Sequence, residues 1–243
     1  RCLKLDREVS SVFDYDKSNL IGYDMSDYHN KGKDRSKSYH ILISKQDGSI
    51  TREIFIPFKT IDTPVVTGDG GFVASYSYQI RQSHGKCTLM DTSSDTLYNY
   101  APDGTLTPFI ARTPSAHTME PEVFLYMGIY TDRYYFMRTM KKEVDFKTFK
   151  GFPSTDLVYD KQEKALFEYT LYNADYSNKQ QVSLGLSFNG IVNHEIATCQ
   201  SLEAASLIEA HEKGQLKGRL KEIAAGLDEE SNAVIMLVKY RKK

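Results

Sequence analysis

The sequence contains no tryptophan and only three cysteines in 243 residues. The cysteines, Cys2, Cys87 and Cys199, lie far apart without a C-x-x-C spacing, which argues against a disulfide framework or a thiolate zinc site. The longest apolar run, Ala233 to Val238, is far too short to span a bilayer. Basic residues (31) and acidic residues (32) balance, so the chain has no field that would attract nucleic acid. We therefore predict no nucleic-acid partner and no transmembrane segment in this chain.

Familiar catalytic and cofactor motifs are also absent. The sequence has no G-x-S-x-G, no P-loop and no G-x-G-x-x-G, so the common hydrolase, nucleotide and dinucleotide interpretations lose their support. Asp14, Asp16 and Ser18 copy the first ligand positions of a calcium loop, but Asn19 replaces the turn glycine and Met25 replaces the bidentate glutamate. We interpret that segment as a hairpin turn. The sequence thus predicts no catalytic residues, no cofactor-binding residues, no metal ligands and no bound cofactor.

What the sequence does contain is a repeated hairpin pattern. Asp47-Gly48 separates two β-rich runs within residues 38–58, and Asp-Gly is a strong hairpin signal because glycine readily supplies φ > 0. The pattern recurs at Asp103-Gly104, about 56 residues later, and again at residues 161–164. Such a spacing is typical of a repeat array.

The repeats predict four sets of short antiparallel strands. The first set is Val9 to Tyr15, Leu20 to Met25, Tyr39 to Ser44 and Ile50 to Phe58. The second set is Pro64 to Thr67, Phe72 to Gln79, Leu97 to Tyr100 and Thr105 to Ile110, with Gln82 to Lys86 as a loop. The third set is Val123 to Tyr130, Tyr134 to Met140, Leu157 to Tyr159 and Leu166 to Tyr172. The fourth is a hairpin of Val182 to Phe188 and Ile191 to Ala197 on Asn189-Gly190, followed by Ala233 to Lys239.

Residues 201–226 interrupt the fourth set with helical spacing. Ser201 is the predicted N-cap of a first helix that ends at Gly214, and Gly226 is the predicted C′ residue of a second. Isolated helices of this length are marginal in water, so we expect their apolar side chains to be buried: Leu202, Ala205, Ile208, Leu216, Leu220 and Ile223.

Four-stranded antiparallel units of roughly 56–60 residues each predict an all-β fold, a β-propeller with about four blades and a short helical insertion near the C-terminus. We expect residues 1–243 to form a single β-propeller domain, with the helical insertion at residues 201–226. The fourth unit is one strand short, and the chain begins at Arg1 without methionine or a signal peptide. We therefore expect a processed, trimmed or fragmentary chain.

The ending from Leu220 to Lys239, LKEIAAGLDEESNAVIMLVK, resembles the C-terminus of the six-bladed β-propeller proteins common in Bacteroides-type bacteria, a family similar to the TolB-like and NHL-like propellers. In that family a short helix runs into an acidic-Asn-Pro turn and an apolar strand that ends in lysine. This sequence has Ala233 where proline is usual. The resemblance implies an extracytoplasmic protein (periplasmic or at the cell surface), often a lipoprotein, with no established activity. It also implies an N-terminally incomplete six-bladed ring, with a possible lipid anchor in the missing N-terminus.

Propeller topology indicates where a ligand would bind. Loops from strand four to the next strand one, and from strand two to strand three, share one face of a propeller. That face would carry Asp62, His84, His117, Glu120 and Glu122, together with the helical insertion of residues 201–226. Two histidines and several carboxylates near a central funnel could bind a cation or a polar ligand, and the alternative is that they are ordinary surface loop residues.

Two functions remain open from the sequence. The leading prediction is a non-enzymatic binding or scaffold propeller with an unknown ligand or protein partner, because the repeat array carries no nucleophile, base or cofactor motif. The alternative is a propeller hydrolase or lyase that uses funnel carboxylates with His84 or His117. Two carboxylates and a histidine within hydrogen-bond reach in one pocket would favour the enzyme.

Overall fold

A computed structural model describes residues 4–26, 38–58, 63–68, 70–75, 79–83, 86–184 and 196–239. The chain divides into two compact units. Unit 1 consists of Arg1–Gly128 and Met137–Thr155, and unit 2 consists of Ile129–Phe136 and Asp156–Lys243.

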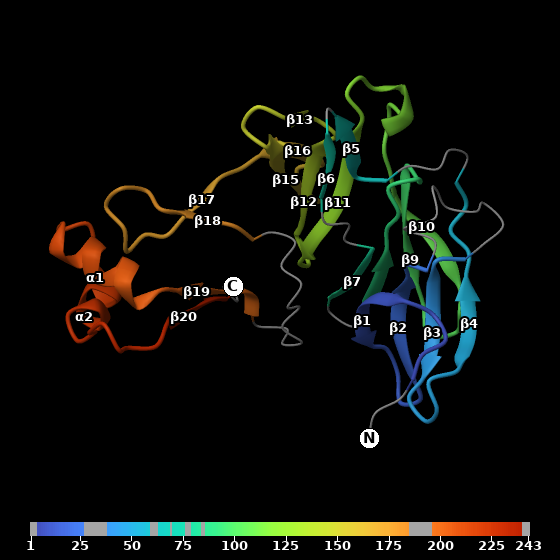
Figure 1. Ribbon diagram of the computed structural model, residues 1–243, viewed down its shortest axis with the longest axis horizontal. Helices are drawn as coiled ribbons and strands as arrows, with labels where there is room; N and C mark the ends of the chain where they lie inside the picture. The colour runs from blue at the N-terminus through green and yellow to red at the C-terminus, as the bar shows by residue number, and fades with distance from the viewer. Residues whose placement is uncertain are drawn as a thin grey trace. The chain divides into compact units, whose positions relative to one another are not determined.

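The first sheet of unit 1 is an antiparallel meander in chain order (Figure 1). Its strands are β1 (Val9–Asp14), β2 (Asn19–Asp24), β3 (His40–Ser44) and β4 (Ile50–Ile54). In the turn between β3 and β4, Gly48 has φ +81° and donates its N–H to the Ser44 oxygen at 2.9 Å. Between β1 and β2, Asp16 Oδ1 accepts the N–H groups of Ser18 and Asn19, each at 2.7 Å. The predicted first strand set and both hairpin turns are therefore confirmed.

The second four-stranded sheet differs from the prediction. Its strands are β7 (Ile80–Ser83), β8 (Lys86–Leu89), β9 (Thr96–Tyr100) and β10 (Leu106–Ala111). The first two predicted strands, Pro64 to Thr67 and Phe72 to Gln79, form instead a separate two-stranded hairpin of β5 (Val65–Gly68) and β6 (Gly71–Ala74).

The segment Gln82 to Lys86, predicted as a loop, thus belongs at its two ends to paired strands, since Ser83 lies opposite Lys86. Its polar composition resembled a loop because β7 and β8 alternate polar residues with Ile80, Cys87 and Leu89, which are buried. A strand that is half polar offers only a few apolar positions to the pattern.

The core of unit 1 lies between these two sheets. Buried side chains from both sheets contact one another, and they include Ile21, Leu42, Ile54, Ile80, Leu89 and Tyr100. Polar groups enter this core in pairs. The Tyr23 hydroxyl donates to Asp91 Oδ2 at 3.0 Å, and His40 Nε2 lies 3.1 Å from the Gln79 oxygen. Because buried polar groups need partners, these pairs allow the two sheets to pack closely.

A third four-stranded sheet confirms the third predicted strand set. Its order is β11 (Val123–Tyr130), β12 (Tyr134–Lys141), β15 (Ser154–Asp160) and β16 (Ala165–Glu168). The connection between β12 and β15 contains a small hairpin of β13 (Val144–Asp145) and β14 (Lys150–Gly151). The predicted strand Leu166 to Tyr172 is interrupted after β16.

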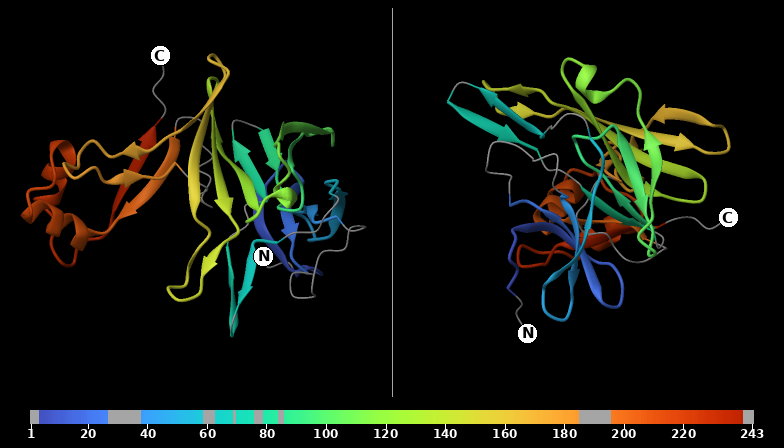
Figure 2. Two further views of the ribbon diagram at one scale, coloured as in Figure 1. Left: turned by 90° about the horizontal axis from the view of Figure 1, so that it is seen from above. Right: turned by 90° about the vertical axis from the view of Figure 1, so that its right-hand side faces the viewer.

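Unit 2 continues with two two-stranded pairs and two helices (Figure 2). Strand β17 (Leu171–Tyr172) pairs with β18 (Gln181–Val182), and β19 (Ile196–Leu202) pairs with β20 (Val234–Lys239). Helices α1 (Ala204–Glu212) and α2 (Gly218–Ala224) connect β19 to β20. This confirms the last predicted strand and the helical insertion, whereas the predicted turn Asn189-Gly190 lies outside the described residues.

The predicted N-cap at Ser201 is wrong. Ser201 lies in β19 opposite Ile235, and Glu203 precedes the first helical residue. Ladder pairing with β20 holds Ser201 in the sheet, so α1 begins later than the sequence pattern indicates.

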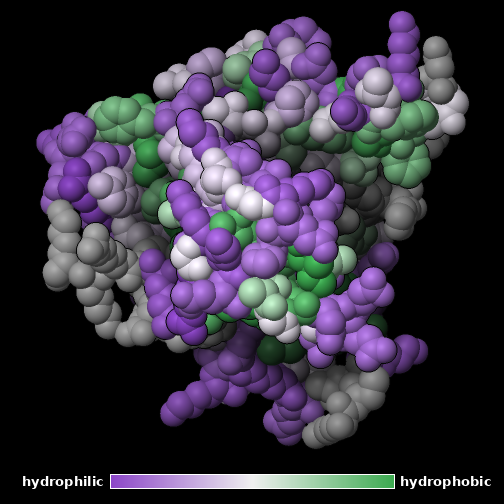
Figure 3. Space-filling view, turned by 90° about the vertical axis from the view of Figure 1, so that its left-hand side faces the viewer, coloured by the Kyte–Doolittle hydropathy of each residue, from purple (hydrophilic) through white to green (hydrophobic). Residues whose placement is uncertain are grey.

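The helices pack around Leu207, Ala210, Leu216, Leu220 and Ala224, all of them buried. Half-buried Tyr176, Leu202, Leu227 and Val234 contact this cluster. Ala205 and Ile223, which were predicted to be buried, are exposed, and Ile208 is half-buried. The inward positions of the two helices are instead Leu207 and Ala210 in α1, and Leu220 and Ala224 in α2. The face seen in Figure 3 is mostly hydrophilic, with small hydrophobic patches.

Taken together, the described elements confirm an all-β fold of four-stranded antiparallel sheets with a short helical insertion. Three such sheets are present among the described residues. The fourth predicted set is represented there by β19 and β20.

Replacing Leu220 by alanine tests the packing of the insertion. Leu220 is only 6% exposed, so we expect the free energy of unfolding of unit 2 to fall by about 2–4 kcal/mol, the usual cost of a buried leucine. Ile223→Ala in the same helix is the matched control, because Ile223 is 36% exposed and should cost less than about 1 kcal/mol. Equal losses in denaturant titrations of the two variants would contradict this packing.

Candidate functional site

The loop between β10 and β11 carries three of the predicted site residues. Its 3₁₀ helix η1 (Ala116–Thr118) contains His117, and Glu122 lies immediately before β11. His117 Nε2 lies 3.3 Å from the Ser93 oxygen, and His117 Nδ1 lies 3.7 Å from Glu122 Oε1. The structure therefore brings two of the predicted residues together in unit 1.

Glu122 also forms an ion pair with a lysine. Lys142 Nζ donates to Glu122 Oε2 at 2.7 Å, and the Lys142 backbone N–H donates to the backbone carbonyl oxygen of Glu122 at 2.8 Å. The two side chains are 22% and 26% exposed, so water screens the pair, and such pairs contribute about 0–1 kcal/mol. The ion pair and the backbone hydrogen bond together tie the start of β11 to the end of β12.

The other predicted residues do not join this pair. Glu120 is exposed, and Asp62 and His84 lie outside the described residues. Within the described ranges, no three His, Cys, Asp or Glu side chains are arranged to hold a metal ion. Among the residues that the structure describes, Glu122 is the one carboxylate shown beside His117, where the hydrolase or lyase interpretation requires two.

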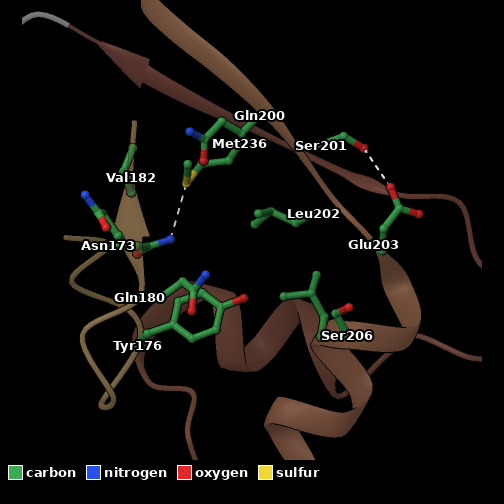
Figure 4. A pocket seen from close by; sticks show the side chains of 12 residues that line it. Asn173, Tyr176, Gln180, Val182, Gln200, Ser201, Leu202, Glu203, Ser206 and Met236 are labelled. Carbon is green, nitrogen blue, oxygen red and sulfur yellow. Dashed lines mark hydrogen bonds between the residues drawn. The ribbon is translucent and has the colours of Figure 1, made fainter. Parts of the chain in front are cut away.

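A pocket of about 230 Å³ lies in unit 2 (Figure 4). It is bounded by the β17–β18 hairpin, the β19–β20 pair and the first turn of α1. Leu202 projects into its middle, with the amide side chains of Asn173 and Gln180 on one side and Glu203 and Ser206 on the other (Figure 4).

Amide and hydroxyl groups dominate the polar lining of this pocket. The amides belong to Asn173, Gln180, Gln181 and Gln200, and the hydroxyls to Tyr176, Ser201 and Ser206. Gln200 Nε2 donates to the Ser183 oxygen at 3.1 Å, and Asn173 Nδ2 lies 3.2 Å from the sulfur of Met236. Because a thioether is a weak acceptor, the Asn173 amide can exchange this contact for a stronger one with a ligand.

The segment between β17 and β18 is held in place by the connection between α1 and α2. Tyr176 forms an isolated bridge with Leu216, and the Ser177 N–H donates to the Gln215 oxygen at 2.9 Å. The Lys217 N–H donates to the Asp175 oxygen at 2.9 Å. The buried cluster of the helical insertion thus fixes the position of the Tyr176 ring at the pocket.

The pocket carries little charge. Among the described residues that line it, Glu203 is the only carboxylic acid, and none is a lysine, arginine or histidine. Glu203 Oε1 accepts the Ser201 hydroxyl at 3.3 Å. Burial raises the pKa of Tyr176 above its usual value, so the phenol keeps its proton at neutral pH and can both donate and accept a hydrogen bond.

Sequence reasoning placed the site in unit 1 and missed this pocket. The signal that could have indicated it is the stretch NADYSNKQQ at residues 173–181, which contains four amide side chains. Its pairing with residues 215–217, and its closeness to β19, depend on contacts between distant parts of the chain. A pattern of local spacing does not contain that information.

Comparison with known proteins gives one family and one structural likeness. A family model described as a 6-bladed beta-propeller matches residues 1–197. A crystal structure of a protein named as an exported protein of Bacteroides fragilis is 14% identical, with a TM-score of 0.42, and the match covers 96% of this chain and 77% of that chain. No curated protein matches the sequence.

The family match is independent of the ending on which the resemblance was based. It includes every strand from β1 to β18, whereas α1, α2 and β20 lie beyond it. In the part of the chain that the structure describes, no helix is both long and apolar enough to cross a bilayer.

Replacing Gly218 by alanine tests how the pocket is built. Gly218 has φ +57°, and a Cβ there would lie 2.7 Å from Asp175 Oδ1. We expect the free energy of unfolding of unit 2 to fall by about 1–2 kcal/mol, the cost of a left-handed conformation for a residue with a Cβ, and the segment that carries Tyr176 to loosen.

Gly226→Ala is the matched control, because nothing lies closer than 3.6 Å to a Cβ at that position. Its thermal unfolding should match that of the parent chain. If both variants unfold alike, the contact between Gly218 and Asp175 does not constrain the segment.

Proposed function

Since the chain belongs to the family of six-bladed β-propellers, we propose that it is a non-enzymatic binding protein that holds a small neutral, polyhydroxylated ligand in the pocket of unit 2. One observation carries this proposal: the described residues that line the pocket contribute four amides and three hydroxyls beside a single carboxylate. Each amide offers both donors and acceptors, and each hydroxyl does the same. A ring with several hydroxyl groups, such as a sugar, presents the complementary pattern.

Pocket size and apolar lining agree with such a ligand. A volume of about 230 Å³ is below the roughly 300–1,000 Å³ of pockets for drug-sized molecules, so one ring fits better than an extended chain. Leu202 and Tyr176 offer apolar surface to the C–H face of a ring. Specific sites generally combine such surface with a few placed polar groups.

Charged ligands fit the pocket poorly. An anion would meet Glu203 and no basic side chain among the lining residues, and like charges repel at close range. A cation such as Ca²⁺ prefers several carboxylate or carbonyl oxygens, and the pocket offers one carboxylate. Neutral ligands are therefore preferred.

A hydrolase or lyase is a second candidate because His117 and Glu122 lie beside each other, at 3.7 Å. Its mechanism would need a second carboxylate as acid or base. Binding in the amide-lined pocket needs no second carboxylate, so we prefer a non-enzymatic binding function.

Two further proposals concern the cellular location and the domain organisation of the protein. We propose that the protein works outside the cytoplasm, in the periplasm or at the cell surface, with or without a lipid anchor, as the resemblance of its ending implies. We also propose that residues 1–243 act as one propeller domain.

Isothermal titration calorimetry with neutral sugars, their uronic acids and their amino-sugar analogues tests the binding proposal. We expect neutral sugars to bind best, and the uronic acids to bind more weakly because of Glu203. Gln200→Leu should weaken binding roughly 2- to 10-fold, the change expected for one lost hydrogen bond. Tyr176→Ala should weaken it further because it removes both a hydroxyl and apolar surface.

Tyr172→Ala is the matched control. Tyr172 belongs to the same hairpin and is 49% exposed, but it does not line the pocket, so affinity should not change. Stronger binding of charged sugars or of neutral peptides, or equal losses in the Tyr172 and Tyr176 variants, would exclude a neutral polyhydroxylated ligand in this pocket.

A further inference from the structure

The β13–β14 hairpin of unit 1 ends in two phenylalanines and two lysines that no part of the proposed binding function uses. Its turn reads Phe146-Lys147-Thr148-Phe149, followed by Lys150 in β14. Phe149 is 70% exposed, and Phe146 packs edge-on against it with the ring centroids 6.4 Å apart. A single exposed apolar side chain is common on protein surfaces, so what distinguishes this tip is the combination of the exposed ring with the lysines beside it.

Phe146 anchors the hairpin to its neighbour. The β13–β14 hairpin lies beside the β5–β6 hairpin in both views of Figure 2. A Cβ at Gly68 in β5 would lie 2.5 Å from Cε2 of the Phe146 ring, so the ring rests directly on the glycine backbone. One phenylalanine therefore holds the hairpin, and the other extends into solvent.

Hydrogen bonds within the turn fix its shape. Asp145 Oδ1 accepts the Lys147 N–H at 2.8 Å, and Asp145 Oδ2 accepts the Thr148 hydroxyl at 2.9 Å. Phe149 has φ +52°, which is unusual for a bulky residue. A strained residue persists where its surroundings determine it, and strain of this kind often marks a functional position. The exposed ring is thus presented by an ordered turn.

Positive charge flanks the exposed ring. Lys147 and Lys150 are both exposed, and neither ammonium has a carboxylate partner within the described ranges. The one nearby acid of the turn, Asp145, already accepts two hydrogen bonds from the turn itself. The tip therefore combines one projecting aromatic ring with two available cations.

We propose that this tip docks the protein on an anionic lipid surface. Phe149 enters the boundary between headgroups and acyl chains, while Lys147 and Lys150 extend to lipid phosphates, as long basic side chains do at membrane interfaces. Basic residues near an anionic bilayer each strengthen attachment. This inference is independent of the ligand pocket, which belongs to unit 2.

The geometry favours lipid over a protein partner. A stable protein interface buries about 800 Å² on each partner, with aromatic anchors in preformed pockets. The tip offers one projecting ring on strands of two residues each. A fluid bilayer accepts such a ring without a complementary pocket.

Sedimentation with vesicles tests the proposal, using phosphatidylcholine with and without phosphatidylglycerol. We expect binding only to the anionic vesicles, and weaker binding at high salt because screening shortens the range of attraction. Lys147→Ala and Lys150→Ala should each weaken binding about fivefold, which corresponds to about 1 kcal/mol per basic residue. Phe149→Ala should weaken binding by at least that factor.

Phe72→Ala is the matched control. Phe72 lies in β6 and is also 70% exposed. It pairs with Thr67 of β5, and no lysine stands next to it in the sequence. Its variant should bind vesicles as the parent does. Parent-like melting temperatures for all variants will show that the folds are equivalent.

A tryptophan probe gives a second readout, because the protein has no tryptophan of its own. In Phe149→Trp the emission should shift to the blue when anionic vesicles are added, whereas in Phe72→Trp it should not. Failure to bind anionic vesicles, equal losses in the Phe72 and Phe149 variants, or retention by an acidic protein with no vesicle binding would each overturn the lipid assignment.

Discussion

Pairing of the buried polar groups is the constraint on which unit 1 depends. Asp24 is fully buried, and Arg7 Nη1 donates to it at 3.0 Å. The Tyr23 hydroxyl donates to Asp91 across the two sheets, and burial with that carboxylate raises the pKa of Tyr23 well above its usual value. Without these partners each group would cost free energy on burial, and the sheets could not pack face to face. The groups that could perform chemistry in this core are thus engaged in holding it together.

Charged side chains in the turns and loops are also paired with one another or with backbone groups. In unit 2, two hydrogen bonds from Arg133 lower the pKa of Asp160 to about 2, and Asp160 in turn accepts the N–H groups of the turn that follows. In unit 1, Lys142 holds Glu122 beside His117. The groups that we assign to function lie elsewhere: they are the amides of the pocket and the lysines of the β13–β14 hairpin.

The sequence predicts those parts of the fold that depend on local chemistry. Asp47-Gly48 identifies its hairpin because the turn needs the glycine, and the third sheet follows from clear apolar runs. The first two strands of the second sheet were predicted wrongly, as β5 and β6 in place of β7 and β8. The choice between these two pairs depends on burial against β2 and β3, which are far away in the sequence. His117 and Glu122 were selected because propeller topology assigns their shared loop to the binding face, and they lie close together because only four residues separate them. The pocket was not predicted, because Tyr176 and Gln200 come together only after β17, β19 and the helices have assembled.

Side-chain amide resonances give the most direct test of where a ligand binds. In an isotopically labelled sample titrated with a neutral sugar, the account predicts shifts of the NH₂ signals of Asn173, Gln180 and Gln200, with the backbone signals of His117 and Glu122 unchanged. Shifts centred on His117 and Glu122, with the pocket amides unchanged, would contradict it and assign the site to unit 1.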